Sequence, residues 1–198
     1  MVAGLILAAG RSSRMGRSKA LLRQIQSGNT FVSHLIRVAT GAGLAPVLVV
    51  GRPEDGELRG AVGQARATFV ANPDADQGQL SSILAGLAAA EAAGADEVVV
   101  MPVDVPLVST SVVSSLLRAA EAEGIEIVRA VYKGTHGHPV LFKRSVFNEL
   151  RAADPGMGAR AVVRADPARV KDVEVGDAGV TLDIDTPEDY LRAFGRKL

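Results

Sequence analysis

Short apolar runs alternate with longer helical stretches along the first two thirds of the chain. The runs at residues 2–7, 46–50, 68–70 and 97–101 are rich in aliphatic residues and predict strands. Apolar residues spaced three or four positions apart predict helices over 31–42, 80–93 and 110–123. Strands that alternate with helices are typical of βαβ units, so the pattern predicts an α/β fold with a mostly parallel sheet.

The pattern becomes less regular after residue 124. Residues 125–131, 140–142, 170–175 and 180–184 predict further strands, and the helical pieces around 145–150 and 159–165 are short. Thr186 is a plausible N-cap before Pro187, which predicts a last helix that runs to about Phe194. We expect one domain over residues 1–198, in which the second half forms the substrate side of the fold near one sheet edge.

Composition excludes several classes of function. The chain has 198 residues, of which 47% are hydrophobic, and its 22 Lys and Arg are balanced by 22 Asp and Glu. No basic run stands out, so we expect no binding to nucleic acid. The absence of cysteine excludes disulfides, thiolate metal sites and cysteine-held iron–sulfur clusters. The apolar run at the N-terminus is too short to span a bilayer and no charged region precedes it, so we expect a cytoplasmic protein that does not enter a membrane.

A loop of small and cationic residues follows the first predicted strand. Small residues at Ala8, Ala9 and Gly10 let a ligand approach the backbone, and cationic side chains follow at Arg11, Arg14 and Lys19. In open parallel sheets, ligands bind at the carboxyl ends of strands, where loop amides can contact anionic oxygens. The loop therefore predicts a site for the phosphates of a nucleoside triphosphate. Its spacing matches neither the Walker loop nor the dinucleotide GxGxxG motif.

Other polar residues follow later strands. Asp104 comes just after the strand at 97–101, at the sheet edge where the first loop is expected, and a carboxylate there can hold Mg²⁺ against a triphosphate. Asn72 follows the third strand, and Gly78, Ser81 and Ser82 open a helix. These four residues are candidates to bind the nucleotide, with a turn at Asn72-Pro73 and N-capping as the alternative interpretations.

The three histidines differ in what their positions predict. His34 lies in the apolar stripe of an early helix and is interpreted as structural. His136 and His138 are separated by one glycine, a spacing that suits a metal pair, but no third ligand is evident.

The residues quoted so far belong to a series of motifs that resembles the MobA-like nucleotidyltransferases, in the family's order and over nearly the whole chain. The later landmarks are similar to the molybdenum cofactor cytidylyltransferase branch. The motifs are Ala8-Ala9-Gly10, Arg14-Met15-Gly16, Lys19, Asn72-Pro73, Gly78-Gln79-Leu80-Ser81-Ser82-Ile83, Met101-Pro102-Val103-Asp104-Val105-Pro106-Leu107, Gly137-His138-Pro139, Gly158-Ala159-Arg160 and Asp183-Ile184-Asp185-Thr186-Pro187-Glu188-Asp189.

The resemblance implies a Rossmann-like three-layer sandwich of the nucleotide-diphospho-sugar transferase type. It implies a nucleotide-binding half at about 1–107 and an acceptor-binding half at about 108–198. Catalysis is assigned to Arg14, Lys19 and Asp104. Binding of the nucleotide is assigned to Leu7, Ala8, Ala9, Gly10, Arg11, Ser12, Arg14, Lys19, Asn72, Gly78, Ser81 and Ser82. Binding of the acceptor is assigned to Gly137, His138 and Pro139.

The resemblance also implies a second Mg²⁺ ligand from the segment 183–185. Residues two apart in a strand share one face, so periodicity does not choose between Asp183 and Asp185, and we select Asp185. For Asp183 and Asp189 we favour structural roles, solvation of a strand end and a negative charge at a helix N-terminus.

The implied reaction transfers a nucleoside monophosphate to a phosphate of molybdopterin or its molybdenum-loaded form. The pair Ala8-Ala9 matches the cytidylyl pattern, whereas guanylyl relatives usually carry glycine at the second position, so CTP is the expected donor. A molybdenum hydroxylase is the expected client. Two segments depart from the family pattern and put the acceptor in doubt: Val105 replaces glutamine, and residues 154–160 are longer than the corresponding motif and lack its acidic residue.

Two other functions stay open on the same scaffold. One is an NAD(P)H-dependent oxidoreductase like the nicotine blue oxidoreductases, although no dinucleotide motif follows the first strand. The other is a non-catalytic carrier of a nucleotide or pterin.

Overall fold

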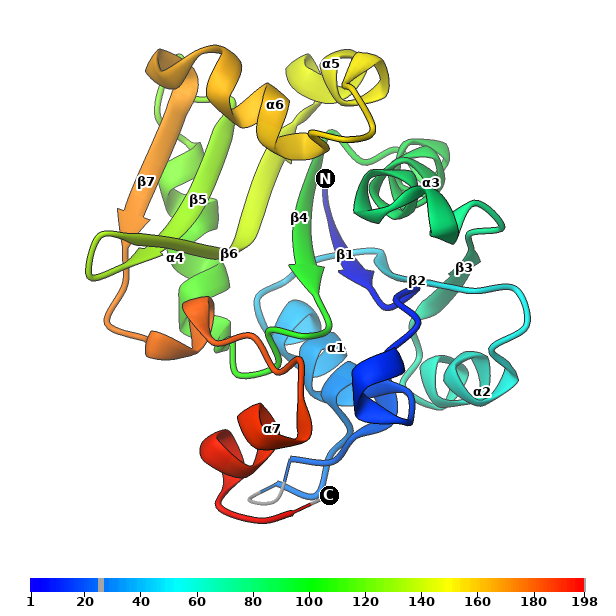
Figure 1. Ribbon diagram of the computed structural model, residues 1–198. Helices are drawn as coiled ribbons and strands as arrows, with labels where there is room; N and C mark the ends of the chain where they lie inside the picture. The colour runs from blue at the N-terminus through cyan, green and yellow to red at the C-terminus, as the bar shows by residue number, and fades with distance from the viewer. Residues whose placement is uncertain (25–26, 198) are drawn as a thin grey trace.

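The computed structural model describes residues 1–24 and 27–197, and its strands form one sheet (Figure 1). The strand order is β3-β2-β1-β4-β6-β5-β7. Only β6 runs antiparallel to its neighbours, β4 and β5, and every other pairing in the sheet is parallel. The mostly parallel α/β sheet expected from the sequence is confirmed. The strands are β1 (Val2–Leu7), β2 (Val47–Gly51), β3 (Thr68–Ala71), β4 (Glu97–Pro102), β5 (Ile127–Tyr132), β6 (Thr135–Lys143) and β7 (Val170–Glu174).

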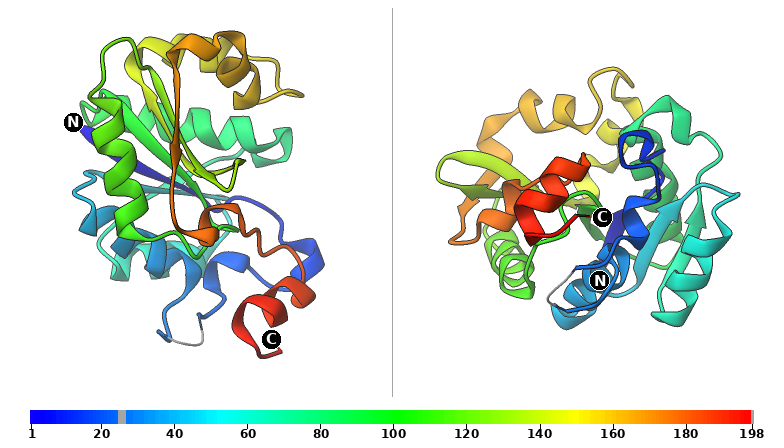
Figure 2. Two further views of the ribbon diagram at one scale, coloured as in Figure 1. Left: turned by 90° about the vertical axis from the view of Figure 1, so that its left-hand side faces the viewer. Right: turned by 60° about the horizontal axis from the view of Figure 1, so that its bottom comes forward.

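Helices cover both faces of the sheet and give three layers (Figures 1 and 2). One face carries α1 (Phe31–Gly41), α2 (Gly56–Gln64) and α4 (Thr110–Ala120), and the other carries α3 (Gln79–Ala92), α5 (Phe147–Ala152) and α6 (Ala159–Ala165). Helix α7 (Pro187–Phe194) lies beyond the carboxyl ends of the strands and packs on Phe31 of α1 (Figure 1). Alternate residues of the central strands enter the two apolar cores, because successive side chains of a strand point to opposite faces. Ile6 and Val99 lie in the first core and Leu5 and Val98 in the second. No helix of the described residues is long and apolar enough to cross a membrane.

Helix α3 lies unusually close to the sheet at Gly86. A Cβ atom added to Gly86 would be 2.0 Å from Cδ1 of Leu5, which is fully buried in β1. Only glycine fits at this contact without displacing the neighbouring side chain. The contact fixes α3 over β1, with the start of the helix beside the loop that follows β1.

The prediction of a strand at residues 180–184 is wrong. Residues Ala178–Thr181 form a 3-10 helix, which begins where the Asp177 carboxylate accepts a hydrogen bond from the Gly179 amide at 2.9 Å. Val180 and Ile184 are fully buried, but the Ile184 amide donates to the Asp104 carbonyl at 2.7 Å rather than to a strand. Burial of these two side chains against the core produced the strand-like pattern.

The sequence pattern did not predict α2. This helix contains Gly56, Gly60 and Gly63 and buries only Leu58 and Val62, so its apolar periodicity is weak.

Candidate active site

The loop after β1 and Asp104 line one pocket of about 250 Å³ at the carboxyl ends of β1 and β4. This is the arrangement that the sequence predicted for a phosphate site. The pocket is lined by Leu7, Ala8, Ala9, Gly10, Ser12, Lys19, Ala20, Ala75, Gly78, Gln79, Ser82, Pro102, Val103 and Asp104.

The loop after β1 is held in a defined conformation by its own contacts. Ser12 adopts a left-handed conformation (φ 50°), and its hydroxyl accepts a hydrogen bond from the Lys19 amide at 3.1 Å. Met15 and Ala20 are buried in the core on either side of this contact. Together these contacts fix the backbone of Lys19 at the wall of the pocket.

Lys19 is surrounded by carboxylates. Its ammonium donates to Oδ1 of Asp185, and the Arg14 guanidinium lies 3.2 Å from Oδ2 of the same carboxylate. The hydrogen bond from Lys19 holds the pKa of Asp185 below its usual range. Burial raises the pKa of Asp104. The negative charges of Asp183 and Asp185 raise this pKa further, and the positive charge of Lys19 opposes the shift. Burial and the charge of Asp185 likewise raise the pKa of Asp183. The site therefore gathers three carboxylates near the partly buried ammonium of Lys19.

The segment that carries these aspartates is tied to the Asp104 loop. The hydrogen bond from the Ile184 amide to the Asp104 carbonyl joins the two segments. Asp189 accepts hydrogen bonds from the Asp185 amide at 3.1 Å and from the amide and hydroxyl of Thr186, and so forms the capping box of α7. The structural interpretation of Asp189 is therefore confirmed.

The donor set of this pocket fits a hard divalent cation. Asp104 lines the pocket, and Asp185 lies beside it in an ion pair with Lys19. Both offer carboxylate oxygens, the ligands that Mg²⁺ prefers. Within residues 1–24 and 27–197, no three His, Asp or Glu side chains are grouped to hold a metal. An ion held by two carboxylates would complete its shell with phosphate oxygens and water, as Mg²⁺ commonly does in phosphoryl-transfer enzymes.

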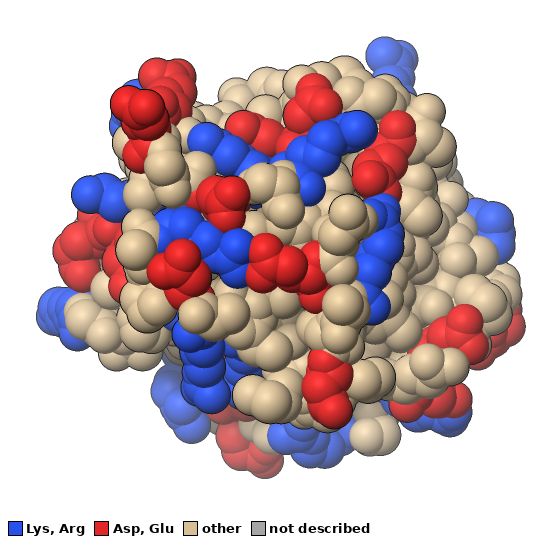
Figure 3. All heavy atoms as spheres, turned by 90° about the horizontal axis from the view of Figure 1, so that it is seen from above, with Lys and Arg blue, Asp and Glu red and all other residues tan. Residues whose placement is uncertain are grey.

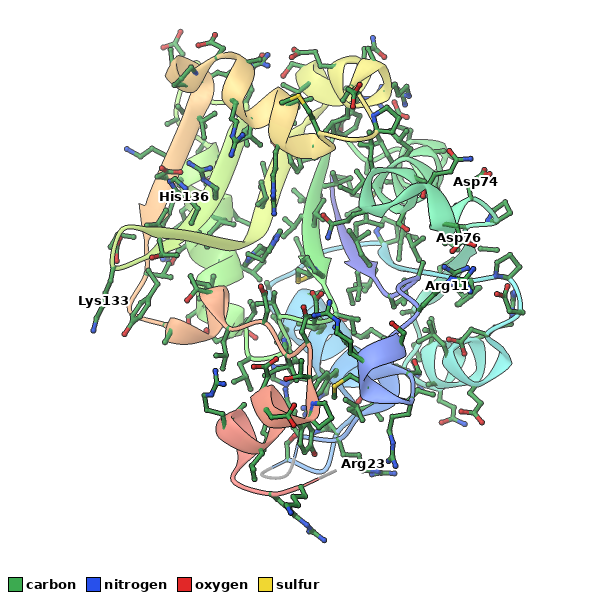
Figure 4. The ribbon with its side chains drawn as sticks, viewed as in Figure 1. Arg11, Arg23, Asp74, Asp76, Lys133 and His136 are labelled. Carbon is green, nitrogen blue, oxygen red and sulfur yellow. The ribbon has the colours of Figure 1, made fainter. Side chains whose placement is uncertain are left out.

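Arg11 faces away from this pocket. Its guanidinium pairs with both carboxylate oxygens of Asp76 at 2.9 and 2.5 Å, and Arg52 binds the same carboxylate at 2.5 Å. Figure 4 shows Arg11 and Asp76 side by side at the surface. These ion pairs hold the pKa of Asp76 well below its usual range. Arg11 thus links the first loop to the segment before α3, and its role in nucleotide binding stays a prediction.

Asn72 is committed to contacts within the protein. The side chain is 2% exposed, and its Nδ2 donates to the hydroxyls of Ser81 and Ser82, both at 3.0 Å. Its Oδ1 accepts from the Asp74 amide at 2.9 Å. Of these residues only Ser82 lines the pocket, together with Gly78, whose backbone has φ 101°. Nucleotide binding by Asn72 and Ser81 stays a prediction, since their side chains organise the start of α3.

A second pocket of about 810 Å³ adjoins the first. It lies between α3, α6 and the side of the sheet formed by β5, β6 and β7. Gln79 lines both pockets. Gly137 and His138 line it, as the predicted acceptor site requires, whereas Pro139 is buried outside it. The pocket is lined by Gln79, Leu80, Ile83, Val100, Arg129, His136, Gly137, His138, Val140, Phe142, Pro155, Gly156, Met157, Gly158, Ala159, Arg160, Val163, Arg164, Pro167, Val170 and Asp172.

The second pocket is cationic on balance. Arg129 pairs with Asp172 at 2.9 and 3.0 Å, and His136 lies 3.2 Å from the same carboxylate. Arg160 and Arg164, one turn apart on α6, form no ion pair with the described residues. On the face seen in Figure 3, by contrast, cationic and anionic side chains are interspersed.

Gly137 and His138 shape the floor of this pocket. A Cβ on Gly137 would be 2.2 Å from the Val180 carbonyl oxygen, so glycine permits the close approach of β6 to that segment. Burial, with the charge of Arg160, lowers the pKa of His138 to about 4. His136 instead pairs with Asp172, and among the described residues neither histidine belongs to a group of three side chains that could hold a metal. His34 contacts the Val108 carbonyl at 3.1 Å, which confirms its structural interpretation.

Several pocket residues were not identified as site residues from the sequence. Arg129 and Asp172 meet because β5 and β7 pair in parallel with these two residues in register. Gln79 and Arg160 lie in motifs that the sequence analysis noted for their resemblance, without a role for either side chain. These residues lie far apart along the chain, so no local sequence pattern indicates that they share a pocket.

Comparison with known proteins identifies related sequences over most of the chain. The family model described as "MobA-like NTP transferase domain" matches residues 4–172. The purine catabolism protein PucB of Bacillus subtilis is 32% identical over 196 residues, covering 94% of this chain and 93% of its own. A probable molybdenum cofactor guanylyltransferase of Opitutus terrae is 37% identical over 140 residues, or 66% of each chain. The molybdenum cofactor cytidylyltransferase of Escherichia coli is 27% identical and covers 97% of this chain and 95% of its own.

Solved structures agree with this assignment. The crystal structure of Rv0371c from Mycobacterium tuberculosis superposes with a TM-score of 0.83 at 28% identity, covering 98% of both chains. A complex of Rv0371c with manganese superposes with a TM-score of 0.78 at 27% identity over 98% of both chains, which supports the use of a divalent metal in this group. The predicted fold and the resemblance noted in the sequence are thereby confirmed. The chain is a nucleotidyltransferase that belongs to the MobA-like NTP transferase domain family.

Proposed function

We propose that this protein transfers CMP from CTP to the phosphate of molybdopterin, or of its molybdenum-loaded form, and releases pyrophosphate. The observation that carries the proposal is the pair of adjoining pockets. The smaller one is lined by Lys19 and Asp104, and Asp185 binds Lys19 and Arg14 beside it. The larger one is cationic and big enough for a ligand of about drug size. The smaller pocket is lined by residues of the proposed nucleotide-binding half alone, and most residues of the larger pocket come from the acceptor-binding half.

The nucleotide half of the reaction depends on charge. Lys19 and Arg14, which pair with Asp185 in the free protein, turn to the triphosphate when it binds. Asp104 and Asp185 would hold Mg²⁺, which would supply charge neutralisation at the phosphates. A phosphate monoester is already anionic near neutral pH, so the protein needs no general base and acts by alignment and electrostatic stabilisation.

The acceptor half offers both charge and apolar surface. Arg160 and Arg164 attract an anionic acceptor, while Leu80, Ile83 and Val163 provide an apolar wall for a ring system. His138 is neutral at pH 7 and serves as a wall that donates or accepts one hydrogen bond. The product would serve a client molybdenum hydroxylase, and the name of the PucB relative favours a client in purine catabolism.

The choice of CTP rests on the pair Ala8-Ala9 at the pocket wall. The relatives include both guanylyl- and cytidylyltransferases, so the donor must be measured. The test incubates the protein with CTP, GTP, ATP or UTP, Mg²⁺ and molybdopterin, and detects pyrophosphate and the dinucleotide by chromatography. We expect product with CTP at least tenfold faster than with GTP, a difference that one or two pocket contacts provide.

The same experiment separates the two other functions. NADPH oxidation without pyrophosphate release would favour the oxidoreductase, and binding of CTP or molybdopterin without any turnover would favour the carrier. Either result would overturn the proposed transfer reaction.

A further inference from the structure

Gln79 stands where the two pockets meet. It is the single residue of the described chain that lines both of them. The side chain is exposed, and no hydrogen bond among the described residues engages its carboxamide. The neighbouring polar residues differ in this respect: Ser81 and Ser82 accept hydrogen bonds from Asn72, and Gln77 donates to Asp74.

The backbone of Gln79 is held firmly despite the exposure of its side chain. It is the first residue of α3, after Gly78 in a conformation (φ 101°, ψ −178°) that is essentially restricted to glycine. The close contact of Gly86 with Leu5 fixes α3 on the sheet, and the buried amide of Asn72 binds the first turn. The start of α3 therefore holds Gln79 at the border of the two pockets.

We infer that Gln79 is a positioning residue that contacts both substrates and aligns the acceptor phosphate with the α-phosphorus of the nucleotide. This inference rests on the proposed function. An amide is neutral, so it can approach two phosphates without repelling either, and it offers two N–H donors and one acceptor oxygen. No other described residue lines both pockets, so Gln79 is the residue placed to contact both substrates directly.

The step that Gln79 aligns is a direct displacement. An acceptor phosphate oxygen forms a bond to the α-phosphorus, and the bond from the α-phosphorus to the α–β bridging oxygen breaks. The electron pair leaves with pyrophosphate. Gln79 gains and loses no proton, and its contribution is orientation of the two reacting groups, which is worth large rate factors in phosphoryl-type transfers.

The test compares Gln79→Ala and Gln79→Glu with the matched control Gln77→Ala. Gln77 is exposed, has the same side chain two residues earlier and lines neither pocket. Steady-state rates are measured with CTP, Mg²⁺ and molybdopterin, and chromatography separates the dinucleotide from free CMP formed when water replaces the acceptor. Thermal unfolding of each variant reports its fold.

We expect Gln79→Ala to lower kcat for the dinucleotide by about tenfold to a hundredfold, with KM for CTP within about twofold of wild type. The share of CTP hydrolysed to CMP should rise, because a bound nucleotide without an aligned acceptor reacts with water. Gln79→Glu should lower kcat further, since its charge repels both phosphates. Gln77→Ala should match wild type, and all variants should keep the wild-type Tm.

Two results would overturn the role of Gln79. One is a Gln79→Ala protein with wild-type kcat and wild-type partition between dinucleotide and CMP. The other is an equal loss in Gln77→Ala, which would indicate a general effect on the start of α3. A wild-type protein that forms no dinucleotide would instead overturn the proposed function, and this role with it.

Discussion

Lys19 and a divalent cation compete for the same carboxylate. The Asp185 carboxylate accepts a hydrogen bond from Lys19 and pairs with Arg14, so both of its oxygens are engaged before any ligand binds. A cation can bind Asp185 well only after these side chains move to another anion. The triphosphate is that anion, and its binding and metal binding should therefore support each other.

Lys19→Ala should have opposite effects on metal affinity and on turnover. Removal of the ammonium frees Oδ1 of Asp185, so the affinity for Mn²⁺ without nucleotide should rise several-fold, as titration calorimetry at pH 8 would measure. Turnover should nevertheless fall by a factor of about a hundred or more, because charge on the triphosphate loses its buried partner. Lys171→Ala, at an exposed lysine of β7, is the control and should change neither quantity. Full turnover in Lys19→Ala would remove Lys19 from the mechanism.

The buried imidazole of His138 predicts how the stability of the protein depends on pH. Burial lowers its pKa to about 4, whereas the unfolded side chain titrates near 6.5. Between these values acid protonates the unfolded chain but not the folded one, so stability falls as pH decreases from about 6.5 towards 4, by at most about 1.4 kcal/mol per pH unit. His138→Gln should reduce the loss between pH 7 and pH 5, which urea unfolding at the two pH values would measure. A variant as acid-sensitive as wild type would contradict the burial of a neutral imidazole.

At the scale of elements, the sequence predicted the first half of the sheet well because strands and helices alternate there, as in βαβ units. Lys19 and Asp104 could be placed together for the same reason, since both follow parallel strands that end at one edge. The second half depends on non-local pairing. β6 inserts antiparallel between β4 and β5, and the pairing of β5 with β7 brings Arg129 to Asp172.

The errors have similar causes. The segment at 180–184 carries strand-like apolar residues whose burial comes from packing against β5, β6 and the Asp104 loop, not from a ladder. Gln79 could not be recognised because its importance arises from two pockets that form only when α3 and α6 are in place.

Arg169 joins three elements that surround the larger pocket. Its guanidinium binds Glu126 just before β5 at 3.0 Å, Glu149 of α5 at 2.6 and 2.5 Å, and the Val162 carbonyl of α6 at 3.4 Å. The Arg169 side chain is 15% exposed and that of Glu149 is 43% exposed, so solvent screens part of this interaction.

Arg169→Leu should destabilise the protein by about 1–2 kcal/mol, because two carboxylates lose their partner. The hydrogen bonds from Arg169 also lower the pKa of Glu149, so this stabilisation is present above the usual glutamate pKa and is lost as pH falls below it. Urea unfolding at pH 7 and pH 4 would measure both effects. Lys171→Leu is the control, and equal stability of the two variants would contradict a role of Arg169 in holding these elements.

At the scale of the whole molecule, the two halves share one sheet. β6 belongs to the proposed acceptor-binding half but lies beside β4 of the nucleotide-binding half. A cut at residue 107 would expose the edge of β4 and the buried side chains of Val98 and Val100. The halves are therefore functional regions, and we expect them to fold as one unit.

This arrangement predicts a single cooperative unfolding transition. Far-UV circular dichroism and the fluorescence of Tyr132 and Tyr190 should report the same midpoint in urea. CTP and Mg²⁺ at about a hundred times the dissociation constant should raise stability by about 2.7 kcal/mol and shift both signals together. The residues assigned to the nucleotide all lie in the first half, and the second half is expected to contribute only the metal ligand Asp185. A fragment of residues 1–107 should fail to fold. Two separate transitions, or a ligand shift confined to one signal, would mean instead that the acceptor-binding half unfolds independently of the nucleotide site.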